Sequence, residues 1–488
     1  MEHNPIPAAI GRTCHHPCES ACNRLGYDGA VSINALEQYV GDMAIEQGWT
    51  LPSPAIELDK KVAVLGGGPA GLSCAYQLRR KGFQVTLYDA NPELGGVLRY
   101  GVPEFRLPKR VVAAEVRRIV DLGVQVVSDR KVYANALDEL EKEYSAVFIG
   151  FGAQNSRTLP QFPKADSRVF DAVDFLRRIT LGAPMTLGKK AVVIGGGSVA
   201  MDVAGSALRL GSAVTIVALE GRAAMPAFED EIRDVLDEGA LLIDGAVVKK
   251  VERTSSAFKL RCVKAKLDPR APVGVIRALE VKNSDFDLDA DAVIVAVGQD
   301  AELAGWEARI KIGKRRVMAV DNGYMTGRAG VFAAGDVANV QRFVSTAVGD
   351  GKRAAQSVAR YLGQTEADID DTGVRVNEVS FADINTFYLP PAKKEDRSKL
   401  DARTRSAGFT EMRRGFAGEQ AQFQSGRCFS CGSCTECDNC FYFCPDTAIV
   451  KDPSSPAHYR VLDQYCKGCG CCIEECPRGA IGFKEEIK

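Results

Sequence analysis

The sequence predicts an α/β protein with two parallel-sheet domains, one inserted into the other, a small α+β domain after them and a short helical, cysteine-rich segment before them. Three observations predict this fold. A strand–glycine turn–helix–strand pattern occurs twice in the 488 residues, apolar strands run into glycine turns after each copy, and cysteines gather at the two ends. Strands joined through a helix run parallel, because the crossover returns the chain to the same edge of the sheet.

Composition excludes several classes of protein. Formal net charge is −1 and 26% of residues are charged, whereas a nucleic-acid binder usually carries a basic surplus. No apolar run reaches the roughly 18 residues of a membrane-spanning helix. The N-terminus does not have the charged-then-apolar pattern of a signal peptide. We therefore expect a cytoplasmic protein with no membrane span and no nucleic-acid partner.

The first strand–turn–helix–strand unit begins at Lys60. VAVL predicts a buried strand, Gly66, Gly68 and Gly71 follow with G-x-G-x-x-G spacing, LSCAYQLRRKG has helical periodicity, and QVTLYD is a second strand ending in Asp89. In such a unit the glycines permit a tight turn, close approach of a pyrophosphate and close helix packing, while the acid accepts a hydrogen bond from a ribose hydroxyl. This unit predicts a dinucleotide site.

The second unit repeats this order in KKAVVIGGGSVAMDVAGSALRLGSAVTIVALE. Its turn carries Gly195 and Gly197, with Ala200 in the third place, and its second strand ends at Glu220. One glycine motif is weak evidence, but two complete units are strong. The competing interpretation is two glycine-rich turns without nucleotides. Two dinucleotides indicate a flavin and a nicotinamide cofactor, and hence two Rossmann-like domains.

Further strands support this interpretation. AVFIGFGAQ (146–154) and DAVIVAVGQD (291–300) indicate crossings between two domains, and GVFAAGDVANV (330–340) ends in Gly335–Asp336 before a helical pattern. With these segments the chain resembles the flavoprotein reductases with two dinucleotide-binding domains. The resemblance implies that Asp336 binds the flavin ribityl chain.

Longer motifs narrow the resemblance. ELGGVLRYGVPEFRLPK (93–109), MPA at 225–227 and NPIPAAIGRTCHHPCESACNR near the start resemble the small subunit of glutamate synthase and related NAD(P)H:ferredoxin oxidoreductase subunits, over about residues 4–425. The resemblance implies that the segment from Gly95 and Gly96 through Leu107 to Lys109 lies over the flavin.

These features predict a domain organisation. Residues 364–427 are too polar and too long for a loop inside a compact domain, so we expect them to form a strap on the flavoprotein surface. The predicted parts are an N-terminal cysteine-rich segment (1–58), a split FAD-binding domain (59–165 and 298–365), a nicotinamide-binding domain (166–297), the strap (366–427) and a ferredoxin-like domain (428–488).

The nicotinamide cofactor is predicted from Glu220. An acid at this position pairs with a ribose 2′-hydroxyl, whereas a basic residue accommodates a 2′-phosphate. Relatives that use NADPH carry a Tyr-Arg-Arg run here, and this chain has Ala218, Leu219 and Glu220 instead. NADH is therefore favoured over NADPH. Arg222 is the counter-evidence, and its alternative interpretation is a solvated loop residue.

Eleven of the sixteen cysteines fall between positions 428 and 476. Two C-x2-C-x2-C-x3-C-P runs predict two [4Fe–4S] clusters, in which the last cysteine of each run ligates the other cluster. Zinc usually takes paired knuckles instead. One predicted set is Cys434, Cys437, Cys440 and Cys476, and the other is Cys466, Cys469, Cys472 and Cys444.

The remaining cysteines are harder to assign. Cys428, Cys431 and Cys471 are interpreted as structural thiols; a cluster bound in a shifted register by 428–437 is the alternative. The trio Cys14, Cys18 and Cys22 resembles cysteines that help to hold a [4Fe–4S] cluster in the glutamate synthase family. Further ligands there come from an upstream segment that this sequence does not contain. The expected fourth ligand is Glu37, His15, His16 or a partner residue; a Cys3His zinc site and loose thiols are the alternatives.

Together these features predict a flavin-dependent NADH:ferredoxin-type oxidoreductase, the nicotinamide-linked electron-transfer subunit of a larger redox complex. FAD converts hydride chemistry to single-electron chemistry, and the protein orients and tunes it without an acid–base triad. No C-x-x-C pair lies between the two units, so dithiol chemistry is not expected. The alternatives are an NADPH-dependent glutamate synthase small subunit and a non-catalytic ferredoxin-bearing assembly subunit.

Overall fold

The computed structural model describes residues 2–162, 166–254, 257–271, 277–365, 378–455 and 457–483. The chain forms two compact units. The first comprises Met1–His15, Val40–Ile369 and Ser398–Arg414, and the second His16–Tyr39, Asp370–Arg397 and Gly415–Lys488. These units cut across the predicted boundaries: both nucleotide-type domains share the first unit, while the N-terminal segment and the strap are each divided between the two.

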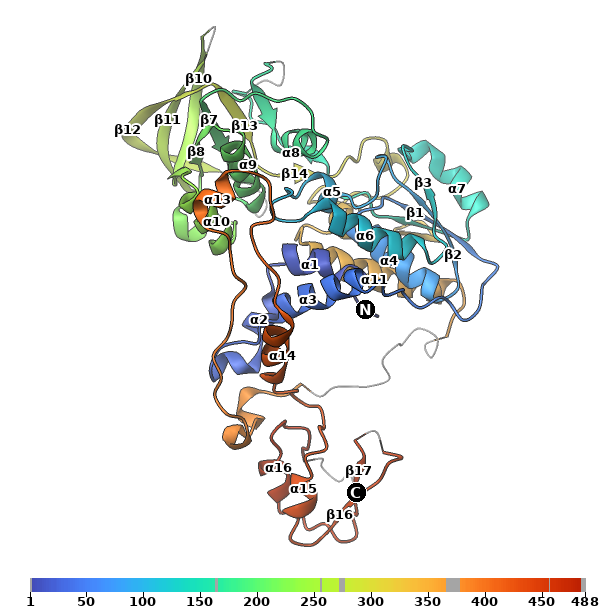
Figure 1. Ribbon diagram of the computed structural model, residues 1–488. Helices are drawn as coiled ribbons and strands as arrows, with labels where there is room; N and C mark the ends of the chain where they lie inside the picture. The colour runs from blue at the N-terminus through green and yellow to red at the C-terminus, as the bar shows by residue number, and fades with distance from the viewer. Residues whose placement is uncertain are drawn as a thin grey trace. The chain divides into compact units, whose positions relative to one another are not determined.

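The first parallel sheet lies in the first unit and has the strand order β15-β4-β1-β2-β3. Every neighbouring pair in it is parallel. β15 comes from far along the chain, so the domain is split around an insertion, as expected. Helices α4, α6 and α11 lie beside this sheet (Figure 1). The elements are β1 (Lys61–Leu65), β2 (Gln84–Tyr88), β3 (Gln125–Val127), β4 (Ala146–Ile149), β15 (Val331–Ala333), α4 (Pro69–Arg80), α5 (Val97–Tyr100), α6 (Lys109–Val120), α7 (Leu137–Glu143) and α11 (Val344–Tyr361).

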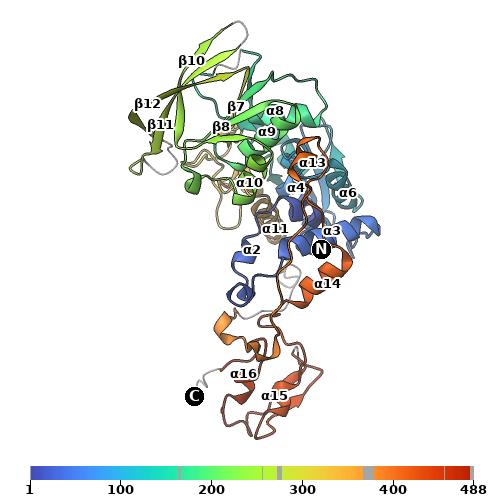
Figure 2. The same cartoon turned by 60° about the vertical axis from the view of Figure 1, so that its left-hand side comes forward.

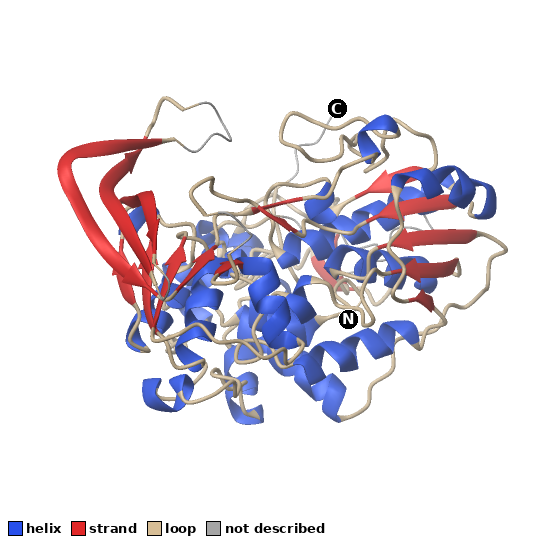
Figure 3. Cartoon of the chain, turned by 90° about the horizontal axis from the view of Figure 1, so that it is seen from above, coloured by secondary structure: helices blue, strands red, loops and turns tan. Residues whose placement is uncertain are grey.

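The inserted segment builds a second parallel sheet with the order β6-β13-β7-β8-β9. A three-stranded antiparallel layer, β10-β11-β12, packs with it through a shared apolar core and forms the long curved strands in Figure 3. The elements are β6 (Val169–Asp171), β7 (Lys190–Ile194), β8 (Ala213–Val217), β9 (Leu241–Ile243), β10 (Ala246–Arg253), β11 (Phe258–Leu267), β12 (Ala278–Ala290), β13 (Ala292–Val295), α8 (Ala172–Thr180), α9 (Ser198–Arg209) and α10 (Glu229–Asp237).

The chain passes between the two sheets through a short antiparallel pair. β5 (Asn155–Ser156) pairs with β14 (Gln299–Asp300). Arg157 and Asp300 form an ion pair of 2.8 Å beside it. These crossings follow the two apolar strands from which the sequence predicted them.

The N-terminal helix α1 (Pro7–Thr13) is anchored by a buried carboxylate of α6. Glu115 accepts hydrogen bonds from the backbone N–H groups of Ala8 (2.6 Å) and Ala9 (3.0 Å). These are N–H groups of the first helical turn, which have no partner inside the helix. Glu115 thereby caps α1 from another element and fixes where the N-terminal segment starts.

The second unit is smaller. Its elements are α2 (Pro17–Ser20), α14 (Gly418–Gly426), α15 (Asn439–Tyr442), α16 (Cys471–Glu474), β16 (Ile449–Lys451) and β17 (Tyr459–Val461), while α3 (Ile33–Glu46) begins in this unit and ends in the first. β16 and β17 are antiparallel and lie with α15 and α16 in the C-terminal part (Figure 1). Among the described helices, none has the length and apolarity that a bilayer crossing requires.

Candidate functional site

The first glycine turn leads from β1 into α4. Gly66 has a φ of +106°, a left-handed conformation that side chains other than glycine rarely adopt. A Cβ on Gly71 would overlap the Gly66 carbonyl oxygen, so glycine lets α4 pack directly on the turn. Asp89 at the end of β2 accepts from the Gly67 N–H (2.7 Å) and from the Asn91 N–H (2.8 Å). The carboxylate therefore orders the turn, and it keeps free lone pairs for a ribose hydroxyl.

The segment of residues 95–109 packs onto this turn. Gly95 donates to the Gly67 carbonyl (2.8 Å), and a Cβ on Gly96 would lie 2.7 Å from the Gly68 Cα. Lys109, at the other end of this segment, stabilises the segment's backbone. Its ammonium donates to the Leu98, Val102 and Leu107 carbonyls.

Two residues that the resemblance placed over the flavin thus shape the segment from within. Leu107 is fully buried in the core of the first sheet. Burial lowers the pKa of Lys109 to about 8.

Asp336 lies where the last strand ends, beside the same turn. A Cβ on the preceding Gly335 would lie 2.8 Å from the Ala70 Cβ at the start of α4. Among the described residues, Asp336 accepts no hydrogen bond, and burial raises the pKa of its carboxyl. A desolvated carboxylate needs a partner. A flavin ribityl hydroxyl would supply one, so the residues fit a bound FAD.

The second turn repeats the geometry of the first. Gly195 has a φ of +140°, and a Cβ on it would overlap the Ala296 carbonyl. Ala200 is buried in α9. The MPA segment closes over the turn through a 3.1 Å hydrogen bond from the Ala227 N–H to the Gly196 carbonyl. This is a cradle of the same kind, and it fits a second dinucleotide.

Glu220 stands over this second turn as Asp89 does over the first. A Cβ on Gly196 would lie 2.7 Å from Glu220 Oε2. Arg222 is engaged elsewhere: its guanidinium donates to Glu229 (2.8 Å) and its backbone N–H donates to Asp244 (2.7 Å). The acid therefore faces the turn, and the arginine is paired on the surface.

Gly197 offers a test of nucleotide binding that is separate from folding. A Cβ there would meet nothing within 4 Å, and its φ of −91° suits any residue. We expect Gly197→Ala to fold normally and to bind NADH about tenfold more weakly, or by about 1.4 kcal/mol, because only the pyrophosphate comes close to this position. Titration of NADH into the folded variant, with its thermal midpoint as the control, checks this. An unchanged affinity would contradict the nucleotide site.

The two C-terminal cysteine runs bring their thiols together across the runs. The pKa of Cys440 rises to about 11 through burial first, and then through Cys434, Cys437, Cys476 and Cys472.

The second group forms around Cys472. Burial raises its pKa, and so do Cys444, Cys466 and Cys469. The thiols that raise the pKa of Cys440 belong to its predicted ligand set, except Cys472. Those that raise the pKa of Cys472 all belong to the other predicted set. Within the described part of the chain, no three His, Cys, Asp or Glu side chains are already arranged around a metal position.

The predicted N-terminal ligands are divided between the two units. Cys14 packs against the core of the first unit, whereas Cys18 and Cys22 belong to the second. The His15 ring stacks on Phe228, 4.9 Å between centroids. His16 lies 3.7 Å from Glu19.

Contacts that the sequence did not predict join the nicotinamide-type domain to the 95–109 segment. Arg106 forms ion pairs with Asp202 on α9 (2.6 Å) and Glu231 on α10 (2.7 Å). Burial raises the pKa of Asp202 to about 6, against the lowering effect of Arg106. No local pattern signals a pair 96 residues apart.

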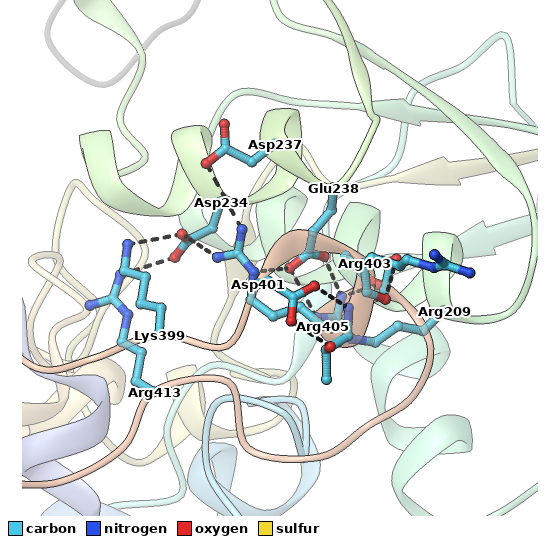
Figure 4. Close-up of polar contacts among 12 residues, drawn as sticks. Arg209, Asp234, Asp237, Glu238, Lys399, Asp401, Arg403, Arg405 and Arg413 are labelled. Carbon is cyan, nitrogen blue, oxygen red and sulfur yellow. Dashed lines mark hydrogen bonds and ion pairs between the residues drawn. The ribbon is translucent and has the colours of Figure 1, made fainter.

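Part of the predicted strap, residues 398–414, clamps onto α9 and α10 (Figure 4). Asp234 accepts from Lys399 (2.9 Å), Arg405 (2.8 Å) and Arg413 (3.0 Å). Its side chain is only 4% exposed. The short helix α13 (Ala402–Ser406) carries Arg405 and lies near α9 and α10 in Figure 2. Residues 398–414 therefore pack against α10 at this point.

Two isolated cysteines of the first unit are inert. Burial raises the pKa of Cys74 in α4 and raises that of Cys262 in β11 to about 11. Both are fully buried, and reactive thiols are accessible thiolates. Neither thiol therefore has the exposure that a reactive cysteine needs.

Comparison with protein families gives two matches. Residues 60–351 match the family described as pyridine nucleotide-disulphide oxidoreductase. Residues 1–49 match the family described as dihydropyrimidine dehydrogenase domain II, 4Fe–4S cluster. The first match covers more than half of the chain.

Several curated proteins are similar. The beta subunit of NADP(+)-dependent formate dehydrogenase of Moorella thermoacetica is 33% identical over 87% of this chain and 65% of its own length. The beta subunit of NADPH-Fe(3+) oxidoreductase of Geobacter sulfurreducens is 29% identical over 88% of this chain and 70% of its own. The PreT subunit of the NAD-dependent dihydropyrimidine dehydrogenase of Escherichia coli K12 is 34% identical over 74% of this chain and 83% of its own length. This chain thus spans about two thirds of the first two relatives.

A solved structure supports the fold. Mycobacterium tuberculosis FprA in complex with NADPH superposes with a TM-score of 0.53 at 17% identity, covering 62% of this chain and 84% of FprA. The predicted two-domain flavoprotein fold is therefore confirmed. The chain belongs to the pyridine nucleotide-disulphide oxidoreductase family, and this match, with the 4Fe–4S segment and the subunit relatives, confirms the resemblance to glutamate-synthase-like NAD(P)H:ferredoxin oxidoreductase subunits.

Proposed function

We propose that this protein is a flavin-dependent NADH:ferredoxin-type oxidoreductase and the nicotinamide-linked electron-transfer subunit of a larger redox complex. One observation carries the proposal: a chain with two dinucleotide turns, each with an acid over it, also groups cysteine thiols across two ferredoxin runs. Such a chain contains groups for hydride and for single-electron chemistry.

Each side chain has a proposed role. The turns at Gly66–Gly71 and Gly195–Ala200 hold the two pyrophosphates, Asp89 and Glu220 accept from ribose hydroxyls, and Asp336 accepts from the flavin. Bound FAD supplies the exchange between hydride and single electrons. Gly96, Leu107 and Lys109 hold the covering segment in shape. The proposed cluster ligands are Cys434, Cys437, Cys440 and Cys476 for one cluster, and Cys466, Cys469, Cys472 and Cys444 for the other.

Partners and location are also proposals. The relatives are named as subunits of formate dehydrogenase, Fe(3+) oxidoreductase and dihydropyrimidine dehydrogenase, which supports a redox protein as partner in a hetero-oligomer. We place the complex in the cytoplasm. Both directions, oxidation of NADH and reduction of NAD+, use the same groups.

NADH preference is proposed from Glu220 and tested there. A carboxylate that accepts a hydroxyl is worth about 1.5–3 kcal/mol, so Glu220→Arg should lower kcat/KM for NADH by about 10- to 100-fold and improve use of NADPH. Arg222→Ala is the matched control, because Arg222 is bound to Glu229. If Arg222→Ala lowered NADPH use while Glu220→Arg changed nothing, the 2′-phosphate interpretation of Arg222 would hold instead; two relatives are named for NADP(H).

The proposed function is tested on the full chain purified without oxygen. We expect bound FAD, about eight irons from the C-terminal clusters, and viologen reduction that is faster with NADH than with NADPH. Absence of flavin, or of dye reduction, would refute the proposal. A preference for NADPH would favour the glutamate-synthase-type alternative.

A further inference from the structure

The segment that carries two unassigned cysteines, Cys428 and Cys431, is bound tightly to the N-terminal segment of the same unit. Arg427 is 2% exposed. Its guanidinium donates to the carbonyls of Gly29 (2.7 Å) and Ala30 (3.0 Å) and to the Asp28 carboxylate (3.0 Å). A fully buried guanidinium with several acceptors is a strong anchor.

A second anchor fixes the register of this segment. Phe429 is buried, 6.0 Å from the Tyr27 ring, and the Arg24 guanidinium lies over it at 4.9 Å. Arg24 also donates to the Arg427 carbonyl. Because residues 24–30 hold both Arg427 and Phe429, the segment that carries Cys428 and Cys431 has a fixed position next to Asn23 and Arg24.

The thiols themselves are engaged. The Asn23 amide, next in sequence to Cys22, lies 3.4 Å from Cys431 Sγ as donor, and it is oriented by a 2.8 Å hydrogen bond to the Val379 carbonyl. Cys431 therefore lies beside Asn23, the residue that follows Cys22, although 408 positions separate Asn23 and Cys431 in the sequence.

Cys428 accepts a hydrogen bond typical of cluster sulfurs. Its Sγ accepts from the Ser430 N–H at 3.4 Å. The proposed ligands Cys444 and Cys476 accept in the same way from Ala448 (3.2 Å) and from Ala480 (3.3 Å). Hydrogen bonds to sulfur are one way in which proteins tune iron–sulfur clusters.

Counting thiols points to one set. After the eight proposed ferredoxin ligands, the second unit retains Cys471, which interacts with Cys469, and four others: Cys18, Cys22, Cys428 and Cys431. A [4Fe–4S] cluster takes four thiolates, and the match over residues 1–49 indicates such a cluster. Cys18 lies in α2, and Cys22 lies two residues after the end of that helix.

We infer that Cys428 and Cys431 complete the N-terminal [4Fe–4S] cluster together with Cys18 and Cys22. This deepens the proposed function and rests on it. It replaces the expected fourth ligands Glu37, His15 and His16. It also makes Cys14, which packs against the core of the other unit, dispensable for iron binding. Three clusters would then belong to one folded unit.

The test is iron and labile sulfide per chain in full-length protein purified without oxygen, with electron paramagnetic resonance of the reduced protein. We expect about twelve irons in the wild type. Cys22→Ser and the double variant C428S/C431S should each hold about eight and lose the same signal. Combining them should remove no further iron. Cys471→Ser and Cys14→Ser are controls that should keep about twelve.

A measurement on the unaltered protein covers variants that fail to fold. Iodoacetamide should leave Cys428 and Cys431 unlabelled in the loaded protein and label them together with Cys22 as iron is chelated. Labelling of Cys428 and Cys431 while Cys22 stays protected would overturn the inference. So would about eight irons in the wild type, or full iron in the double variant. Flavin content and NADH reduction of the flavin, measured on the wild type, show separately whether the proposed function fails.

Discussion

Gly71→Ala is expected to abolish most flavin binding. The new Cβ would overlap the Gly66 carbonyl, which is backbone and cannot rotate away, so the first turn of α4 must move off β1. Overpacking of this kind costs about 1–3 kcal/mol. It also moves the helix N-terminus that we propose binds the pyrophosphate. We expect FAD content to fall about tenfold, the equivalent of about 1.4 kcal/mol, measured by flavin absorbance per chain.

The control makes the same chemical change where there is room. Gly327 lies in the second half of the predicted FAD domain, and a Cβ there would meet nothing within 4 Å. Gly327→Ala should retain its flavin. Normal flavin content in Gly71→Ala would mean that the turn does not hold the cofactor.

Asp234→Ala should be the most destabilising change outside the two turns. It would remove the buried carboxylate that Lys399, Arg405 and Arg413 share. Breaking a buried ion pair in this way costs about 3–5 kcal/mol. We expect the strap to detach and the urea midpoint to drop, as measured by circular dichroism and by proteolysis within residues 398–414.

Asp237 on the same helix is the matched control. It is 55% exposed and 3.9 Å from Arg405, so Asp237→Ala should cost at most about 1 kcal/mol. Equal effects of the two variants would contradict the conclusion that Asp234 anchors residues 398–414.

The ion pairs of Asp234 also predict how the stability of the protein changes with pH. Burial raises the pKa of Asp234, but Arg413 and Lys399 outweigh burial and lower it overall. A lowered folded pKa means that the contribution to stability is present above the unfolded pKa, about 3.9, and is lost as pH falls through the folded pKa. Lowering the pH should therefore reduce the free energy of unfolding of the wild type more than that of the Asp234→Ala variant.

Local sequence patterns were sufficient for the two strand–turn–helix–strand units. Each is built from neighbours in the chain, so glycine spacing and apolar periodicity determine its backbone, and the acids Asp89 and Glu220 fall over their turns as a consequence. The spacing of the two cysteine runs led to the two proposed ligand sets, and thiols of both runs lie near Cys440 and Cys472.

Leu107 and Lys109 show where a motif alone is insufficient. The motif placed them over the flavin, whereas the structure uses Leu107 as core and Lys109 to bind three carbonyls of its own segment. A pattern of residue types does not say which way each side chain points.

By itself, then, the sequence determined the two nucleotide units, the ferredoxin runs and the split around the insertion, because each depends on spacing along a short stretch of chain. Only the tertiary structure decided that Arg106 joins α9 and α10, that residues 398–414 surround Asp234, and that Cys431 lies beside Asn23. These contacts join residues from about 100 to more than 400 positions apart. They are set by how buried charges and rings find partners once the chain is packed, and no local periodicity records that choice.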